Sequence, residues 1–265
     1  MLPISACIMC KNEATKIAAA LDSLAWCQDV VVVDSGSTDG TVSIVQNHPT
    51  RPRLIHSDWP GYNAQRQFMV AQCRNDWVLM LDADEEISRD LARELQDLRA
   101  EDLVTVGQCE MPRRNYIARR FVRCWGPDYQ SRLVHKERIA WNPTSSFDLW
   151  SAKPPFTTRR LHSAIEHNRL VPYDPHDFND GHIMEERAAM LAAHMAANGK
   201  RAGFCTLLTR PMTTFLKYYV VKGGFLDGRF GLAIAYKTTI GVMLKYSVLY
   251  GNEELRKSAG GRTTE

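Results

Sequence analysis

The sequence lacks several features that would assign its class at once. Its 7 cysteines are odd in number and scattered over 265 residues, a pattern that does not fit a disulfide framework and favours a reducing compartment. No apolar stretch reaches the roughly 18 to 20 residues that a membrane-spanning helix needs, and the N-terminus does not resemble a signal peptide. We therefore expect a cytoplasmic protein that does not cross a membrane.

The commonest nucleotide-binding motifs are also missing. No GxGxxG pattern opens the first expected helix and no GxxxxGK[ST] pattern occurs, which argues against dinucleotide binding and against a P-loop. Hydrophobic residues make up 45% of the chain and charged residues 24%, a balance that excludes disorder, collagen and a coiled coil. What remains is a globular protein with one large domain, or with one domain and an appendage.

The chain as a whole has little excess of either charge, but its C-terminal part has a clear excess of basic residues. The net charge is +3, yet residues 205–252 hold six basic side chains and one acid, so the remainder carries −2. This basic segment is also rich in tyrosine and phenylalanine, a pattern typical of helices at an anionic membrane surface. The alternatives are the core of a helical subdomain and a homo-oligomer contact. Because the body is acidic and has no nucleic-acid-binding motif, we expect no nucleic-acid partner. The six basic residues are Arg210, Lys217, Lys222, Arg229, Lys237 and Lys245.

Short apolar runs alternate with helical patterns over the first hundred residues, as in a parallel α/β sheet. In such sheets ligands bind beyond the carboxyl ends of the strands, so the polar residues that follow each strand are candidate site residues. The expected strands are Ile4–Met9, Val30–Asp34, Arg53–His56 and Trp77–Asp82. The expected helices are Glu13–Leu24, Thr41–Asn47, Tyr62–Cys73 and one whose face carries Ile87, Leu91, Leu95 and Leu98.

The second part of the chain has a different pattern. Extended segments at Glu110–Tyr116 and Ser131–Trp141 indicate a mixed sheet. We expect a helix at Ile183–Asn198 and then amphipathic helices over 204–250, broken at Pro211 and around Gly223-Gly224. The basic stretch 113–138 is either a solvated loop face or a surface for an anionic substrate. The expected domains are 1–165, with halves 1–100 and 101–165, and a helical region 166–265.

The strongest chemical signal is an apolar strand that ends in Asp82-Ala83-Asp84. In an extended chain Asp82 and Asp84 point to the same side, where they can share one divalent cation such as Mg²⁺ or Mn²⁺. A pair of buried carboxylates repels itself unless a cation or a proton intervenes. The alternative is that these acids only begin the next helix, whose macrodipole favours them.

Two further polar segments follow neighbouring strands. Asp34 leads into Ser35-Gly36-Ser37-Thr38-Asp39, where glycine lets the backbone approach a ligand and Asp34 can accept from a base or a ribose; the alternative is a well-capped turn. Cys10-Lys11-Asn12-Glu13 follows the first strand. Because the ligand-binding edge of such a sheet is shared by its strands, these segments and Asp82 are expected to converge.

These residues closely resemble glycosyltransferase family 2, which has the GT-A fold. The resemblance implies an α/β GT-A domain, a Rossmann-like mixed sheet flanked by helices, with a C-terminal helical extension. It rests on Cys10 to Glu13, Val33 to Asp39, Gln65-Arg66-Gln67 and Trp77 to Glu85. The later segments Pro112 to Tyr116, Trp125 to Asp128, Arg132-Leu133 and Gly224 to Gly228 resemble the subgroup that adds a hexose to the heptose region of the lipopolysaccharide inner core.

The resemblance also implies an activity, an inverting and metal-dependent transfer of a hexose from a nucleotide sugar, UDP-glucose first, to a lipid-linked saccharide. The location implied is the inner face of the bacterial inner membrane. By similarity Asp82, Asp84 and His162 would bind Mg²⁺ or Mn²⁺, and this cation would neutralise the leaving diphosphate. The residues expected at the nucleotide sugar are Cys10, Asn12, Glu13, Asp34, Ser37, Arg66, Asp82 and Ala83.

An inverting transfer also needs a base that takes the proton from the acceptor hydroxyl. The Val-His-Glu motif of the subgroup is absent at the expected spacing, and alignment on Trp141-Asn142 places Asp148 there. Asp148 is the predicted base, Asp128 the second candidate and Glu137 the third. The missing motif leaves two alternatives open: transfer to another surface polysaccharide or lipid-phosphate acceptor, and a non-catalytic nucleotide-sugar-binding protein.

Overall fold

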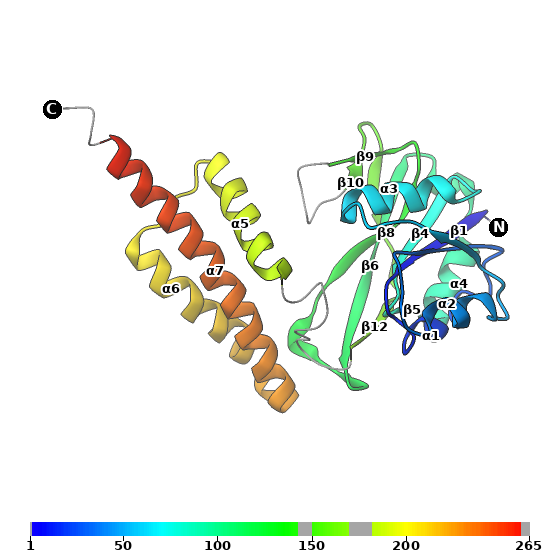
Figure 1. Cartoon of the computed structure of the whole chain (residues 1–265), viewed down its shortest axis with the longest axis horizontal. Coiled ribbons are helices and arrows are strands. Elements are labelled where there is room, and N and C mark those ends of the chain that lie inside the picture. The colour runs from blue at the N-terminus through cyan, green and yellow to red at the C-terminus, as the bar shows by residue number, and fades with distance from the viewer. Residues whose placement is uncertain (1, 143–149, 170–181, 261–265) are drawn as a thin grey trace. The chain divides into compact units, whose positions relative to one another are not determined.

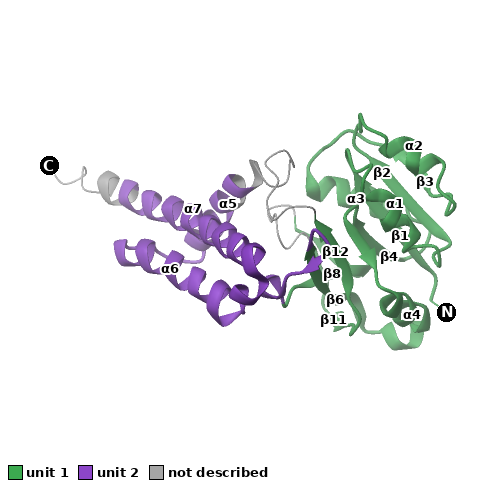
Figure 2. Ribbon diagram, turned by 90° about the horizontal axis from the view of Figure 1, so that it is seen from below, with its two compact units in different colours: residues 1–116, 127–169 green, residues 117–126, 170–265 purple. Residues whose placement is uncertain are grey.

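The structure is a computed structural model that describes residues 2–142, 150–169 and 182–260. Contacts along the chain divide it into two compact units (Figure 2). Unit 1 comprises residues 1–116 and 127–169, and unit 2 comprises residues 117–126 and 170–265. The short segment 117–126 therefore groups with the helices, although it lies in the middle of the expected first domain.

Unit 1 is built on a mixed sheet whose first half is parallel (Figure 1). Its strands lie in the order β3-β2-β1-β4, and each neighbouring pair is parallel. The four expected strands are confirmed to within one residue at each end, and all but the edge strand β3 contain a run of buried apolar residues. They are β1 (Ile4–Cys10), β2 (Asp29–Asp34), β3 (Arg53–His56) and β4 (Trp77–Asp82).

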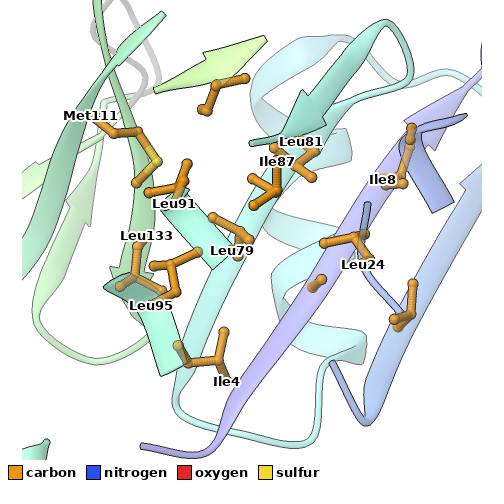
Figure 3. Packing of buried hydrophobic residues seen from close by; sticks show 14 of the residues in the cluster. Ile4, Ile8, Leu24, Leu79, Leu81, Ile87, Leu91, Leu95, Met111 and Leu133 are labelled. Atoms are coloured by element: carbon orange, nitrogen blue, oxygen red, sulfur yellow. The ribbon is translucent and has the colours of Figure 1, made fainter. Parts of the chain in front are cut away.

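Helices cover both faces of the parallel half, which explains why the inner residues of β1, β2 and β4 are almost all apolar. Along β1, Ile8 packs with the cluster that holds α1, α2 and α4, whereas Cys7 and Met9 pack with α3. Figure 3 shows the first cluster, in which Leu91 of α4 lies beside Leu79 of β4. The helices are α1 (Ile17–Asp22), α2 (Thr41–Gln46), α3 (Tyr62–Gln72) and α4 (Arg89–Asp97).

A mixed half extends the sheet beyond β4 in the order β8-β6-β12-β5. Ile87, which was expected on a helix face, lies instead in β5, because β5 pairs with the distant strand β12. The expected strand Ser131–Trp141 is two strands, since β8 pairs with β4 and β9 with β10. The elements are β5 (Glu85–Ile87), η1 (Ala100–Leu103), β6 (Val106–Ile117), β8 (Tyr129–His135), β9 (Ile139–Trp141), β10 (Trp150–Ala152), β11 (Thr157–Arg160) and β12 (Ile165–Arg169).

Unit 2 consists of helices and one short hairpin segment. The segment joins this unit because Val122 and Cys124 pack with Ile234 of α7, and because the Cys124 N–H donates to Oδ2 of Asp227 at 2.8 Å. Helices α6 and α7 lie side by side (Figures 1 and 2). The elements are β7 (Arg120–Phe121), η2 (Arg123–Trp125), α5 (His182–Ala197), α6 (Phe204–Leu216), η3 (Lys217–Val221), η4 (Gly224–Asp227) and α7 (Gly228–Gly260).

The two expected helix breaks have different outcomes. The break at Pro211 is wrong, because Pro211 lies buried inside α6, where the helix forgoes one backbone hydrogen bond without ending. The break at Gly223-Gly224 is confirmed. Gly223 has a φ of 73°, a left-handed conformation that glycine adopts without strain, and α7 begins at Gly228.

The architecture confirms the expected class, an α/β domain with a helix-flanked mixed sheet and a helical C-terminal region. Within the described ranges, none of the helices combines the length and the apolar composition that crossing a bilayer requires.

Candidate active site

The carboxyl edge of the parallel strands brings together the segments that the sequence singled out. In the sheet register Cys10 lies beside Asp34 and Met9 lies beside Asp82. Cys10 and Asp34 are both buried, and the Cys10 thiol lies 3.7 Å from Oδ1 of Asp34. The expected convergence of these strand ends is therefore confirmed.

Asp34 shapes the turn that follows β2. Its carboxylate accepts hydrogen bonds from the N–H groups of Gly36 at 3.1 Å and Ser37 at 3.0 Å, and from the Ser37 hydroxyl. Burial opposes ionisation, but the hydrogen bonds outweigh it and lower the pKa of Asp34. Gly36 has a φ of 82°, which this tight turn requires. Asp34 is thus a fixed anion at the edge of the sheet.

The loop after β1 is joined to this turn by hydrogen bonds in both directions. The Asn12 N–H donates to Oγ of Ser37 at 2.9 Å, and Oδ1 of Asn12 accepts from the Thr38 N–H at 2.8 Å. The Glu13 N–H donates to Oγ1 of Thr41 at 2.8 Å. The two loops therefore form one continuous edge, with Asn12 and Glu13 held against the Asp34 turn.

Asp82 at the end of β4 is held by two arginines. Its Oδ1 accepts from Nη2 of Arg66 at 2.7 Å, and its Oδ2 accepts from Nη2 of Arg132 at 2.5 Å. Both arginines are buried, whereas 32% of the Asp82 side chain is exposed. Burial opposes ionisation, but Arg132 and Arg66 outweigh it and hold the pKa of Asp82 well below its ordinary range. Asp82 is therefore an anion with both oxygens engaged.

The two arginines have more buried donors than partners. Nε and Nη1 of Arg66 and Nε of Arg132 are buried and have no hydrogen-bond partner in the part of the chain that the structure describes. The indole ring of Trp150 lies beside Arg66, with 5.5 Å between the guanidinium carbon and the ring centroid. Unpartnered buried donors are costly. An anionic ligand with several oxygens would satisfy them.

Asp84 faces a different partner from Asp82. The chain turns at Ala83-Asp84, between β4 and β5, so the expected alternation of an extended strand does not continue through Asp84. Oδ2 of Asp84 lies 3.2 Å from Nε2 of His167, whose Nδ1 lies 2.6 Å from Oδ1 of Asn115. Burial opposes ionisation, but the hydrogen bond with His167 and its charge lower the pKa of Asp84.

A buried network of alternating charges supports this turn from behind. Oε1 of Glu85 accepts from Nη2 of Arg132 at 2.6 Å and from Nη1 of Arg113 at 2.9 Å. Nε of Arg113 also donates a hydrogen bond to Oδ2 of Asp128 at 2.8 Å. Glu85 has no exposed surface, and its Oε2 accepts from the Asp82 N–H at 3.3 Å. Arg113 and Arg132 therefore lie inside the unit, not on one basic surface with the rest of 113–138.

The candidates for the general base lie in different surroundings. Asp148 lies outside the described residues. For Asp128, burial opposes ionisation, but Arg113 outweighs it and lowers the pKa of the carboxyl group, which makes Asp128 a weaker proton acceptor. Glu137 follows His135, which pairs with Trp77 at the start of β4, so Glu137 lies at the edge opposite to Asp82.

His162 and His167 occupy different ends of the same segment. The His162 N–H donates to Oε1 of Glu94 on α4 at 3.0 Å. In the register of β12 with β5, His167 lies opposite Glu85 and Ile165 opposite Ile87, so the chain before Ile165 leads away from Asp84. The structure therefore brings His167, and not His162, to Asp84.

Asp84 and His167 are two neighbouring side chains that could contribute ligands to a metal ion. No group of three or more His, Cys, Asp or Glu side chains that could hold a metal ion occurs among the described residues. The side chain of Asp84 is 20% exposed, and its carboxylate is a type of ligand that suits Mg²⁺ and Mn²⁺. A cation with two protein ligands keeps positions open for water and for oxygens of a bound anion. These residues therefore fit an open site rather than a closed structural one.

Sequence reasoning missed four residues of this arrangement, Arg113, Arg132, Glu85 and His167. Arg132 enters only through the resemblance of Arg132-Leu133, and no local motif distinguishes His167 from the other histidines of the chain. The signal that could have found Glu85 is its position directly after the acidic turn, where a third carboxylate needs a buried cation.

Comparison with known proteins gives one family. The model of glycosyl transferase family 2 matches residues 5–156. The chain is 28% identical over 270 residues to the lipopolysaccharide core biosynthesis glycosyltransferase LpsC of Rhizobium meliloti, covering 93% of this chain and 94% of that protein. An uncharacterized glycosyltransferase of Rickettsia conorii is 45% identical to this chain over 94 residues, a match that covers 35% of this chain and 33% of the Rickettsia protein.

Solved structures with a similar course of the chain include two that contain a uridine nucleotide. One is Staphylococcus aureus TarS 1–349 in complex with UDP-GlcNAc, with a TM-score of 0.47, 15% identity, and coverage of 93% of this chain and 92% of that chain. The other is glucosyl-3-phosphoglycerate synthase from Mycobacterium tuberculosis in complex with Mg²⁺ and UDP. Its TM-score is 0.46 at 14% identity, with 73% of this chain and 78% of that chain covered.

Proposed function

Because the chain belongs to glycosyl transferase family 2 and is a glycosyltransferase, we propose that it transfers a hexose from a UDP-sugar, with inversion, to a lipid-linked saccharide. UDP-glucose is the proposed donor and the heptose of the lipopolysaccharide inner core the proposed acceptor. The relative LpsC, whose name places it in lipopolysaccharide core biosynthesis, supports the acceptor because the match spans nearly all of both chains.

The observation that carries this proposal is the grouping of Asp82, Asp84, Arg66, Arg132 and His167 at the carboxyl edge of the sheet. A leaving UDP develops negative charge on its diphosphate. In this proposal the unpartnered N–H groups of Arg66 and Arg132 donate charge-assisted hydrogen bonds to oxygens of the diphosphate. Asp34, with the Asn12 and Glu13 loop, is proposed to receive the uridine, since these residues line the same edge.

Asp84 and His167 are the proposed ligands of Mg²⁺ or Mn²⁺. A bound divalent cation would neutralise the diphosphate as it leaves. Asp82 keeps Arg66 and Arg132 at the edge of the sheet, and its two oxygens are engaged by them. We propose that Asn115 fixes the orientation of the His167 ring through Nδ1, so that Nε2 points to Asp84.

Asp148 is the proposed general base. The described residues on either side of its segment contact α3, which also carries Arg66: the carbonyl of Asn142 accepts from Nδ2 of Asn63 at 2.6 Å, and Trp150 lies beside Arg66. The rival candidates are less suited, since Asp128 is paired with Arg113 and Glu137 lies at the opposite edge. The contacts of the flanking residues Asn142 and Trp150 with α3, together with the less suited rivals, support Asp148 as the base.

The test is transfer by the purified full chain. Protein is incubated with Mn²⁺ and each of several UDP-hexoses, together with lipopolysaccharide acceptors truncated after the heptoses, and the products are measured by mass spectrometry. The proposal expects an acceptor heavier by one hexose with UDP-glucose. UDP binding without transfer to any acceptor, and without hydrolysis of any UDP-sugar, would favour a non-catalytic nucleotide-sugar-binding protein. Transfer only to a lipid phosphate would reject the heptose acceptor.

A further inference from the structure

Exposed large hydrophobic side chains gather in one part of unit 2. Of the 17 such residues in the described part of the chain, 12 lie between positions 204 and 243. On α6 they are Phe204, Leu208, Met212 and Leu216; on η3 and η4 they are Val220, Val221, Phe225 and Leu226; on α7 they are Leu232, Tyr236, Ile240 and Met243. We refer to these twelve residues as the apolar face.

The spacing of these residues gives each helix one apolar stripe. On α6 they recur every four residues, and on α7 they recur at intervals of four, four and three, which is the spacing of neighbours on one side of a helix. Beside the α6 stripe, the partly buried ring of Phe215 lies 5.3 Å from that of Tyr236, which belongs to the α7 stripe. The two stripes therefore belong to neighbouring helices, which lie side by side in Figure 2.

The apolar face is additional to the core of the unit. The inner sides of the helices have their own buried residues, which include Ile234 beside Cys124, and Leu249 beside Ala192 of α5. The outer residues remain in water, with exposed fractions of 66% for Met212 and 80% for Val221. A cluster of exposed apolar side chains of this size is typical of a site where a membrane or another protein docks.

The charges around the face indicate which occupant fits. Arg210, Lys217 and Arg229 are exposed on the same elements, whereas Asp227, the one acid between residues 204 and 252, is bound to the Cys124 N–H. A second copy docked face to face would bring these cations against one another. An anionic lipid surface accepts both the apolar side chains and the surrounding cations.

We infer that the apolar face of α6, η3, η4 and α7 is a membrane-docking surface, which inserts into the headgroup region of an anionic bilayer while Arg210, Lys217 and Arg229 contact the lipid phosphates. This inference does not depend on the proposed reaction, because it concerns a separate surface and its test needs no glycosyl transfer. It gives the expected peripheral membrane contact a defined set of residues.

The experiment measures binding of the full chain to vesicles by co-sedimentation. The vesicles contain equal parts of phosphatidylcholine and phosphatidylglycerol, or phosphatidylcholine alone. We expect binding to the anionic vesicles, and a loss of roughly 100-fold in affinity when Leu208→Ser, Met212→Ser and Ile240→Ser are combined, because apolar area that leaves water on docking is removed. The matched control combines Val104→Ser and Leu255→Ser, which are 63% and 70% exposed but lie outside the face, and it should bind like the wild type.

A second variant tests the cations. Combining Arg210→Gln, Lys217→Gln and Arg229→Gln should lower affinity for the anionic vesicles by roughly 100-fold, since each basic residue near such a surface contributes on the order of 1 kcal/mol. Its binding should also lose most of its dependence on salt. Circular dichroism and thermal melts of each variant should match the wild type, since all substituted side chains are exposed.

A label on Cys205 reports insertion directly. Cys205 is the exposed cysteine of the described residues and lies between Phe204 and Leu208 on α6. The emission of a polarity-sensitive fluorophore at Cys205 should shift to the blue with anionic vesicles and not with phosphatidylcholine alone. Unchanged vesicle binding by the apolar triple variant, or the absence of any vesicle binding, would overturn the inference. A dimer of the wild type that the apolar triple variant converts to a monomer would assign the face to a second copy instead.

Discussion

The Nε2 atom of His167 lies 3.2 Å from Oδ2 of Asp84, although 83 positions separate the two residues. Strand β12 delivers this imidazole because it pairs with β5 directly after the acidic turn, with His167 opposite Glu85. Asn115 on β6 binds the other ring nitrogen at 2.6 Å. The pair is thus held from three strands, which is the kind of support that would fix the proposed ligand set before a cation binds.

Replacement of His167 tests this pair. We expect His167→Ala to weaken Mn²⁺-dependent UDP binding by at least about 10- to 100-fold, which is the loss found when an outer-shell partner of a metal ligand is removed. Isothermal titration calorimetry of UDP, with and without Mn²⁺, measures the effect. The matched control is His162→Ala, which should leave binding unchanged because His162 lies against Glu94. The reverse order of effects would restore His162 as the metal-binding histidine.

The buried glutamate behind the turn is expected to be costly to change. Glu85→Gln leaves Arg113 and Arg132 without their shared carboxylate, and breaking a buried ion pair on one side lowers the free energy of unfolding by about 3 to 5 kcal/mol. Urea unfolding followed by circular dichroism measures this. The control Glu110→Gln breaks an ion pair with Arg160, which is 67% exposed, and should cost about 1 kcal/mol or less. Equal losses for the two variants would contradict the structural role of Glu85.

The environment of Asp29, at the start of β2, should make the free energy of unfolding depend on pH. Burial opposes its ionisation, but hydrogen bonds from Ser5, the Arg74 N–H and Arg53 outweigh it and lower the pKa of Asp29. The unfolded state then binds more protons, so this contribution is complete above about pH 3.9, the ordinary aspartate pKa, and is lost as the pH falls below it through the folded-state pKa.

Asp29→Asn should therefore destabilise the protein at pH 6 by about 1 to 3 kcal/mol, the range for hydrogen bonds to a charged group, and by much less at pH 3. Urea unfolding at both pH values gives the two differences. The control is Asp90→Asn, because the Asp90 side chain is 81% exposed. Its free energy of unfolding should differ from that of the wild type by the same small amount at pH 6 and at pH 3. A gap between wild type and Asp29→Asn that stays constant with pH would show that Asp29 does not act through its charge.

Replacement of the two aspartates considered for the general base should have different effects on catalysis and on stability. Asp148→Asn is expected to lower kcat by about 10²- to 10⁴-fold while UDP binding stays intact, because only proton removal is lost. Asp128→Asn removes a partner of Arg113, so it should lower the free energy of unfolding as well as activity. Steady-state kinetics beside urea unfolding separates the two cases. An unchanged kcat for Asp148→Asn would reject it as the base.

Much of unit 1 could be predicted from the sequence because its signals are local. The strand Trp77–Asp82 is an apolar run that ends in charge, and the helix around Leu91 and Leu95 has a regular apolar period. The meeting of Cys10, Asp34 and Asp82 followed from the rule that parallel strands share a carboxyl edge.

The remainder depends on contacts between distant segments, which no local pattern encodes. Ile87 has the spacing of a helix residue but joins a strand because β12 pairs with it. Pro211 reads as a helix break, yet its buried position on the inner side of α6 outweighs the lost hydrogen bond. The prediction of His162 in place of His167 fails for the same reason, because the pairing of β12 with the distant strand β5 determines which histidine lies beside Asp84.

The central claim is that the Asp82-Ala83-Asp84 turn binds a UDP-sugar together with a divalent cation. The most direct measurement is calorimetric titration of the wild type and of Asp84→Asn with UDP, each with Mn²⁺ and with EDTA. The account predicts that the wild type binds UDP much more tightly with Mn²⁺ than with EDTA and that Asp84→Asn loses this difference. Mn²⁺-dependent binding of equal strength in both proteins would contradict it.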